Sequence, residues 1–133
     1  MKYLLDTNIC IQYLNKRSET IIEHLLQAGR NNVAICSVVK AELYLGAQKS
    51  EYIEKTLLKI ESFISFLHSY SFDDIAAKEY GIIRATLEMS GNIIGPNDLM
   101  IASIAKANNL KLVTNNTKEF NRVPDLIVED WSL

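Results

Sequence analysis

The sequence predicts an α/β fold built on a central, mostly parallel sheet of four to five strands flanked by helices. Short apolar segments rich in β-branched residues alternate along the chain with longer segments whose apolar residues recur at helical spacing. Strands that alternate with helices need crossover connections, which place successive strands parallel to one another. Glycine and proline mark the helix ends rather than a linker, and no repeat or low-complexity tract interrupts the pattern.

Five apolar segments are expected to form the strands. The first begins the chain and the second is identified by its β-branched residues, while the last is short enough to be an edge strand. In order, the expected strands are Tyr3–Leu5, Val33–Cys36, Ser69–Phe72, Leu110–Val113 and Leu126–Val128.

Capping residues and apolar periodicity predict the helices between these strands. Gly46 and Gly91 are typical of helix ends, and proline is favoured in the first helical turn. The expected helices are one capped by Thr7 or Asn8 and continuing through Leu14, one capped by Ser37 and ending at Gly46, one from Glu51 with an apolar stripe to Leu67, one from Asp73 to Gly91, and one beginning at Pro96.

Length and composition are those of an ordinary globular protein. The 133 residues, 48% hydrophobic and 23% charged, are enough for one domain over residues 1–133 with its own core. A formal net charge of -2 argues against broad, non-specific coating of nucleic acid. The N-terminal MKYLLD has no apolar run typical of a signal peptide, and Cys10 and Cys36 lie in apolar segments, so we expect a cytoplasmic protein with reduced core cysteines and no membrane contact.

Acidic and amide side chains stand beside strand ends and helix starts. Asp6 follows the first strand, Glu42 lies about one turn into the second helix, and Asp98 lies in the first turn of the helix begun by Pro96. Asn116 and Glu119 follow the fourth strand. Residues at the carboxyl ends of parallel strands converge on one crevice, so we expect these side chains to meet.

Such a crevice favours a hard cation. Two like charges about 4 Å apart repel by roughly 4 kcal/mol at an effective dielectric constant near 20, a cost that a small domain must relieve by protonation, a basic partner or a bound divalent ion. The oxygen ligands, without His or Cys, favour Mg²⁺ or Mn²⁺ over zinc. A receiver-like phosphoacceptor domain would need a second acid where Thr7 stands and a Lys at the end of the last strand, whereas Lys111 begins its strand. A haloacid-dehalogenase-like phosphatase would need Asp where Asn8 stands.

Four segments carry a family resemblance: LLDTNICI, SVVKAELYLGAQKS, GIIRATLEMSGNIIGPNDLMIASIA and LVTNNTKEFNRVPDLIVEDWS. In this order and spacing, they resemble the VapC-type toxins of bacterial toxin–antitoxin pairs, which are PIN-domain proteins. The resemblance implies a PIN-like three-layer fold and a Mg²⁺- or Mn²⁺-dependent endoribonuclease, an EC 3.1 hydrolase, that inhibits translation until its antitoxin neutralises it.

The resemblance also assigns roles to the acids. Asp6, Glu42 and Asp98 fall on the three acidic active-site positions of the family, with Asp6 and Asp98 as direct metal ligands and Glu42 as the group that orients water, holds a second ion or acts as general base. The fourth position is filled by either Asn116 or Glu119. A further implied residue is Thr114, as a hydrogen-bonding support.

Partners follow from the same resemblance. It implies a VapB-type antitoxin that inserts a cationic side chain into the acidic pocket, an RNA substrate that is tRNA, specifically the anticodon stem-loop of initiator tRNA, and a homodimer that reaches DNA only indirectly through the antitoxin. The alternative is a non-catalytic PIN-scaffold interaction protein, in which the acids cap helices and the amphipathic helix from Glu51 makes protein contacts.

Overall fold

The computed structural model describes residues 2–133 and contains one five-stranded sheet. Every neighbouring pair of strands is parallel, and the strand order is β3-β2-β1-β4-β5. The predicted α/β fold with a parallel sheet is confirmed. The strands are β1 (Tyr3–Leu5), β2 (Val33–Cys36), β3 (His68–Tyr70), β4 (Lys111–Val113) and β5 (Val128–Glu129).

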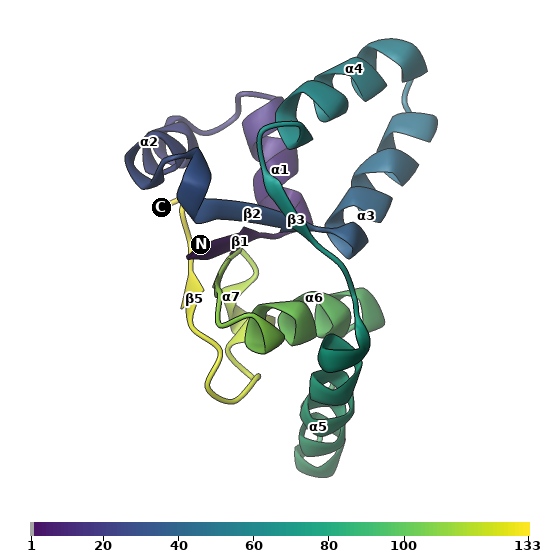
Figure 1. The fold of residues 1–133 in the computed structure, drawn as a ribbon, viewed down its shortest axis with the longest axis vertical. Helices are drawn as coiled ribbons and strands as arrows, with labels where there is room; N and C mark the ends of the chain where they lie inside the picture. The colour runs from purple at the N-terminus through teal and green to yellow at the C-terminus, as the bar shows by residue number, and fades with distance from the viewer. Residues whose placement is uncertain (1) are drawn as a thin grey trace.

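Helices flank the sheet on both sides. In Figure 1, α1 to α4 lie above the central strands and α5 to α7 lie below them, which gives three layers. Within these layers α3 packs on α4 and α5 packs on α6, and α3 also contacts α6 across the end of the sheet. The helices are α1 (Thr7–Leu14), α2 (Glu19–Ala28), α3 (Ser37–Gln48), α4 (Ile53–Ile64), α5 (Asp74–Ser90), α6 (Pro96–Ala107) and α7 (Thr117–Phe120), with a 3₁₀ turn, η1, over Arg30–Asn32.

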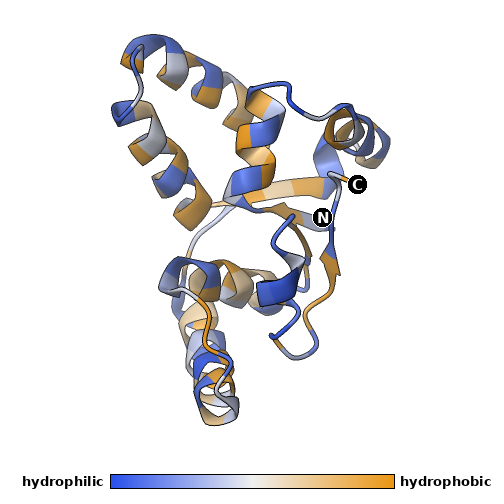
Figure 2. Cartoon of the chain, turned by 180° about the vertical axis from the view of Figure 1, so that it is seen from behind, coloured by the Kyte–Doolittle hydropathy of each residue, from blue (hydrophilic) through white to orange (hydrophobic). Residues whose placement is uncertain are grey.

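The core lies between the sheet and the helices. All four residues of β2 are buried, as expected for a parallel strand covered on both faces. Figure 2 shows the same division along the chain, with hydrophobic colour on the central strands and alternating colours along the helices. Helix α6 is the most deeply buried helix, with six of its residues in the interior: Leu99, Ile101, Ala102, Ser103, Ile104 and Ala105.

The structure changes two of the predicted caps. Asp6, rather than Thr7 or Asn8, is the N-cap of α1, and its side chain accepts a hydrogen bond from the Ile9 amide. Ser37 is the first residue of α3 rather than its cap, and the cap position is held by Cys36, which makes no side-chain capping bond. An N-cap side chain accepts a backbone amide of the first turn, and Asp6 stands at that position, whereas Thr7 already lies within the turn and its hydroxyl donates to Glu42.

Element boundaries also differ from prediction. Helix α3 continues past Gly46 to Gln48, α4 occupies 53–64, and both outer strands shift, β3 to 68–70 and β5 to 128–129. The helices α2 and α7 were not predicted. The start of α5 after the capping Asp73 and its end at a left-handed Gly91 are confirmed, as is Pro96 at the first position of α6.

Both cysteines are buried free thiols, as predicted. Burial raises the pKa of the Cys36 thiol to about 11 and that of Cys10 well above its usual value. Both thiols therefore stay protonated near neutral pH and act as small core hydrophobes. None of the helices in residues 2–133 is both long and apolar enough to cross a membrane.

Candidate active site

The crevice of this sheet lies where the chain order of the strands reverses, between β1 and β4. Leu5 at the end of β1 pairs with Val113 at the end of β4, so Asp6 and Thr114 emerge side by side. The Asp6 amide donates to the Val113 carbonyl at 3.0 Å, which extends the pairing by one residue. In open α/β sheets, ligands bind at this topological switch point.

Asp6 is held in the crevice by contacts on both carboxylate oxygens. Its Oδ1 accepts the Ile9 amide of the first turn of α1 at 3.1 Å, and its Oδ2 accepts a hydrogen bond from the Thr114 hydroxyl. The residue is only 5% exposed, and burial raises the pKa of its carboxyl, a shift that the hydrogen bonds from Thr114 and Ile9 oppose. The charge of Glu42 raises this pKa further, so the two acids are near one another.

Glu42 enters the crevice from α3, the helix that follows β2. Its Oε1 accepts a hydrogen bond of 2.7 Å from the hydroxyl of Thr7, which begins α1. The contact joins residues 35 positions apart and is partly buried. This hydrogen bond joins α1 to α3 and holds Glu42 beside Thr7, the residue that follows Asp6.

Asp98 lies in the first turn of α6, the helix that precedes β4. Burial, the charges of Glu119, Asp6 and Glu42, and a hydrogen bond to Glu119 together raise the pKa of its carboxyl to about 6, with burial as the largest cause. Three acids from different elements thus influence the Asp98 carboxyl group. The carboxylates of Asp6, Glu42 and Glu119 are therefore close enough to Asp98 for their charges to act on it.

The two candidates for the fourth position lie differently. Asn116 precedes α7, and its backbone amide donates to the Thr114 hydroxyl at 3.0 Å, so its main chain supports the residue that holds Asp6. Glu119 lies within α7 and is the charged neighbour with the largest effect on Asp98. The short helix α7 turns Glu119 toward the crevice, and this helix is why an acid three residues further along the chain reaches the site.

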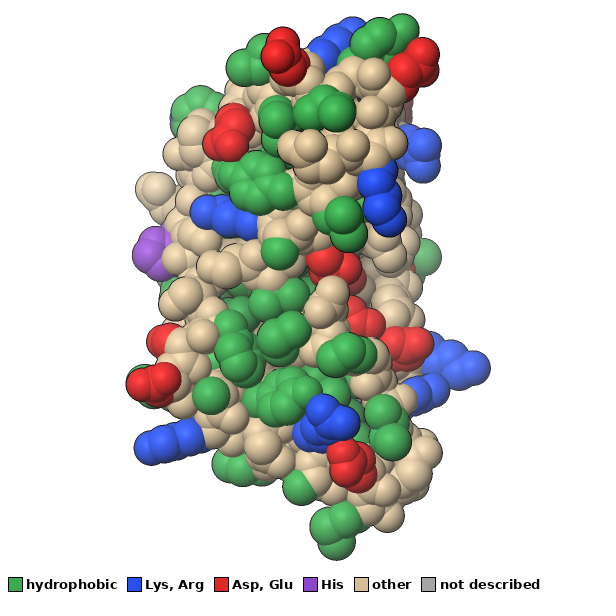
Figure 3. Space-filling model, turned by 90° about the vertical axis from the view of Figure 1, so that its right-hand side faces the viewer, with side chains coloured by type: hydrophobic (Ala, Val, Ile, Leu, Met, Phe, Trp, Pro, Cys, Tyr) green, Lys and Arg blue, Asp and Glu red, His purple; other side chains and the backbone are tan. Residues whose placement is uncertain are grey.

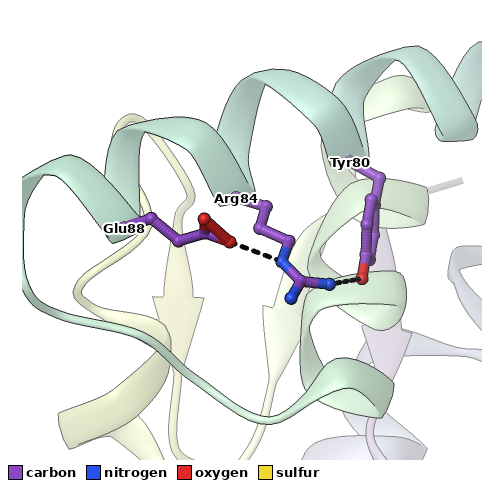
Figure 4. Close-up of polar contacts among 3 residues, drawn as sticks. All are labelled: Tyr80, Arg84 and Glu88. Atoms are coloured by element: carbon purple, nitrogen blue, oxygen red, sulfur yellow. Dashed lines mark hydrogen bonds and ion pairs between the residues drawn. The ribbon is translucent and has the colours of Figure 1, made fainter.

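No basic side chain neutralises these acids within residues 2–133. The two ion pairs found in that range are Arg84–Glu88 and Lys111–Glu129, and neither includes a crevice acid. Figure 4 shows that the guanidinium of Arg84 is engaged on α5 by Glu88 and the Tyr80 hydroxyl, each at 2.8 Å. The helix α3 follows β2 on the right-hand side of the molecule in Figure 1, and on that side Asp and Glu side chains gather near the middle of the face (Figure 3).

The repulsion among these carboxylates is therefore relieved either by protonation or by a bound divalent cation. Its donors are carboxylate and hydroxyl oxygens, which suit Mg²⁺ or Mn²⁺. In the described part of the chain, no three His, Cys, Asp or Glu side chains form a ready metal cage. That arrangement still fits Mg²⁺, which keeps several waters and is usually held by one or two carboxylates together with substrate phosphates. The residues present fit a hard divalent ion completed by water and phosphate.

The raised pKa of Asp98 gives a direct test of its neighbours. We expect Glu119→Gln to lower the pKa of Asp98 from about 6 toward its ordinary value, because one negative charge is removed and the Gln amide can donate to the ionised Asp98 carboxylate. Asn116→Ala should leave that pKa unchanged, since Asn116 carries no charge. Carboxyl ¹³C NMR titration of metal-free protein measures both; an unshifted Asp98 in Glu119→Gln would place Glu119 outside the crevice.

Thr7 is the functional candidate that sequence reasoning missed, because it was considered only as a helix cap. In the sequence, Thr7 could have been found from its position directly after Asp6 in the segment LLDTN, which places it beside the acidic site. Which side chain its hydroxyl would meet depended on how α1 packs against α3, and that packing is a tertiary contact.

Comparison with known proteins identifies the family of this chain and several relatives. The PIN domain family model matches residues 3–126. Ribonuclease VapC2 of Rickettsia felis is 47% identical over 132 residues, 98% of each chain, and the tRNA(fMet)-specific endonuclease VapC of Shigella flexneri is 42% identical over 99% of each chain.

Solved structures include two similar complexes. One is VapBC2 from Rickettsia felis bound to a DNA fragment from its promoter, with a TM-score of 0.93 and 45% identity over 98% of this chain and 99% of that one. The other is DNA-bound VapBC from Salmonella typhimurium, with a TM-score of 0.94 and 40% identity over 98% of each chain.

Proposed function

We propose that this chain, which belongs to the PIN-domain family and within it to the VapC-type toxin ribonucleases, cuts RNA in the crevice between β1 and β4 with the help of Mg²⁺ or Mn²⁺. The observation that carries the proposal is the Asp98 carboxyl. Its pKa is raised to about 6 by burial and by three other acids, in a crevice that no cation of the described chain enters. Perturbed acids of this kind cluster at catalytic sites.

We assign different roles in the reaction to the individual acids. Asp6 and Asp98 would be the direct metal ligands, because the charge of Asp6 acts on the Asp98 carboxyl and burial raises the pKa of both. A bound Mg²⁺ or Mn²⁺ lowers the pKa of a bound water and offsets charge on the scissile phosphate. Glu42 would orient the attacking water or accept its proton, and it keeps one carboxylate oxygen free of the Thr7 contact for that purpose.

For the fourth position we propose Glu119 rather than Asn116. The carboxylate of Glu119 affects Asp98 both by charge and by a hydrogen bond, as expected for a group that shares the same ion or water. Asn116 would act through its backbone, by fixing the hydroxyl of Thr114 that in turn holds Asp6.

We propose tRNA as the substrate, with the anticodon stem-loop of initiator tRNA as the specific target. The name of the Shigella flexneri relative supports this choice, at 42% identity over nearly the whole chain. The net charge of -2 also suits a nuclease that recognises a folded RNA shape better than one that binds any polyanion.

A cleavage assay separates this function from the alternative. Purified protein with total tRNA and Mn²⁺ should give discrete fragments, mapped by sequencing their ends, and EDTA should prevent their formation. Initiator tRNA is expected to be cut at the anticodon stem-loop. Intact tRNA with every metal tested would favour the non-catalytic PIN-scaffold interaction protein.

The partner of the chain is a VapB-type antitoxin, and we propose where it binds. An apolar groove of about 940 Å³ lies among α1, α2 and α4, with Leu26, Leu58 and Phe66 exposed along it. A smaller hollow of about 240 Å³ reaches Glu42. Both hollows include Leu14 and Lys59, so an extended segment in the groove would lead to the crevice, where a cationic side chain could pair with the acids.

A charge placed in the groove tests this route. We expect Leu58→Asp to weaken antitoxin binding at least tenfold, because a 72% exposed apolar side chain that the antitoxin would cover becomes a carboxylate that must be desolvated. RNA cleavage by the free protein should not change. Ile127→Asp, at an exposed position outside the groove, is the control, and titration calorimetry measures both; equal affinities would place the antitoxin elsewhere.

The remaining assembly is part of the same proposal. Ile75, Ile82 and Met89 are exposed on α5 and spaced by seven residues, so they lie along one side of the helix. That apolar stripe suits pairing with a second copy in a homodimer. Contact with DNA would be indirect, through the antitoxin.

A further inference from the structure

Glu42 has one side-chain hydrogen bond in the described chain, and its partner is Thr7. The Thr7 hydroxyl donates to Oε1 at 2.7 Å, whereas Asp6 is held on both of its oxygens. Neither ion pair found in residues 2–133 involves Glu42. The position of the Glu42 carboxylate in the crevice therefore depends on Thr7.

Thr7 is fixed by its surroundings. It directly follows Asp6, whose amide is bonded to β4 and whose side chain caps α1. A β-branched side chain in a helix has few χ1 rotamers, and threonine is divided between two. The hydroxyl therefore has only two preferred positions relative to Asp6, and in the one present here it holds Glu42.

The hydroxyl has no other role in the described structure. Capping of α1 is performed by the Asp6 carboxylate, which accepts the Ile9 amide. The Thr7 hydroxyl has a single proton, and it is given to a carboxylate on another helix. A contact between α1 and α3 that served packing alone would not require it, since the methyl group provides packing.

We propose that Thr7 is a positioning residue for RNA cleavage, which orients the Glu42 carboxylate toward the attacking water. This inference rests on the proposed function. With Oε1 bonded to Thr7, the second oxygen Oε2 is directed by the planar carboxylate and stays available to a water in the crevice. Without the hydroxyl, the three side-chain torsions of Glu42 are free, and the productive orientation becomes one of several.

Three variants test the inference. Thr7→Val removes the hydroxyl and keeps the branched shape, Thr7→Ser keeps the hydroxyl, and Thr86→Val is the matched control because the Thr86 hydroxyl bonds only the Ile82 carbonyl of its own helix. We expect Thr7→Val to lower kcat by about 10-fold to 100-fold, the usual cost of losing a partner that orients an active-site ligand. KM and the melting temperature should change little, and Thr7→Ser should recover most of kcat.

A second measurement does not depend on activity. The ¹³C resonance of the Glu42 carboxyl in metal-free protein should shift in Thr7→Val and return in Thr7→Ser. In a Glu42→Ala background, Thr7→Val should cause no further loss of single-turnover rate, because residues that act as one unit are not additive.

Two results would overturn the inference while leaving the nuclease function intact. In the first, Thr7→Val cuts tRNA as fast as the wild type. In the second, its rate falls only in proportion to a lowered melting temperature, which would assign the contact to stability. If the wild-type protein itself cuts no RNA, the proposed function fails, and an unmoved Glu42 resonance in Thr7→Val then decides against the positioning role as well.

Discussion

Asp98→Asn should abolish RNA cleavage and leave the metal-free protein as stable as the wild type or more stable. The substitution keeps the shape of the side chain but removes the charge that would bind a divalent ion. Losing a metal ligand forfeits several kcal/mol of transition-state stabilisation, or roughly a hundredfold to a thousandfold in rate. The effect on folding has a different sign, because in the metal-free crevice this charge is unfavourable.

The direction of the stability change follows from the Asp98 pKa of about 6. The folded state binds the Asp98 proton more tightly than the unfolded chain, so the free energy of unfolding falls as pH rises from about 4 to 6 and stays lowered above pH 6. Asp98 is half-buried, so solvent screening reduces this cost to about 1 kcal/mol. The favourable interaction of a first-turn carboxylate with the helix dipole is worth about 0.3–1 kcal/mol and offsets much of it. The net change is therefore small or stabilising.

Thermal melts in EDTA at pH 7.5, beside the tRNA assay, measure both effects. Asp74→Asn is the matched control, because Asp74 is also a first-turn acid but is exposed on α5. We expect the control to retain full activity and to lose only its small dipole contribution. If Asp98→Asn melts clearly lower and still cuts RNA, Asp98 is a helix-dipole partner and the site is misassigned.

The sheet and most helices were predictable because their signals are local. Strands buried on both faces need continuous apolar residues, and Gly91 and Pro96 have backbone preferences that mark helix ends wherever they fall. Helix α2 has the local signals of a helix as well, namely Ser18 as its cap and the apolar residues Ile21 and Leu25 at helical spacing. Helix α7 has only four residues, too few for any periodicity to appear.

The acids of the crevice were predictable as a group, but their individual contacts were not. Strand ends determine that Asp6, Glu42 and Asp98 approach one another, because parallel strands end at one edge. The preference for Glu119 over Asn116 depends on the turn of α7 after β4. The Thr7 contact depends on how two helices pack, and a hydrogen bond between residues 35 positions apart leaves no trace in either local segment.

Two substitutions of Asp6 should have the same effect on RNA cleavage and different effects on folding stability. Both Asp6→Asn and Asp6→Ala should eliminate RNA cleavage, because each removes a charged metal ligand. Only Asp6→Ala should destabilise the protein strongly. Asn can accept the Ile9 amide with its carbonyl oxygen, is as good an N-cap as Asp, and places its NH2 group where it can donate to the Thr114 hydroxyl oxygen.

The size of the difference follows from the two lost contacts. Loss of an N-cap costs about 1 kcal/mol, and Thr114, which is fully buried, would keep a hydroxyl without its partner at a cost of about 1–3 kcal/mol. Removing a carboxylate whose pKa burial has raised returns part of this cost in both variants. Asp6→Ala should therefore unfold at a clearly lower denaturant concentration than Asp6→Asn. Equal midpoints for the two variants in metal-free urea titrations would contradict the structure, because they would mean that the Asp6 side chain does not connect β1, α1 and β4.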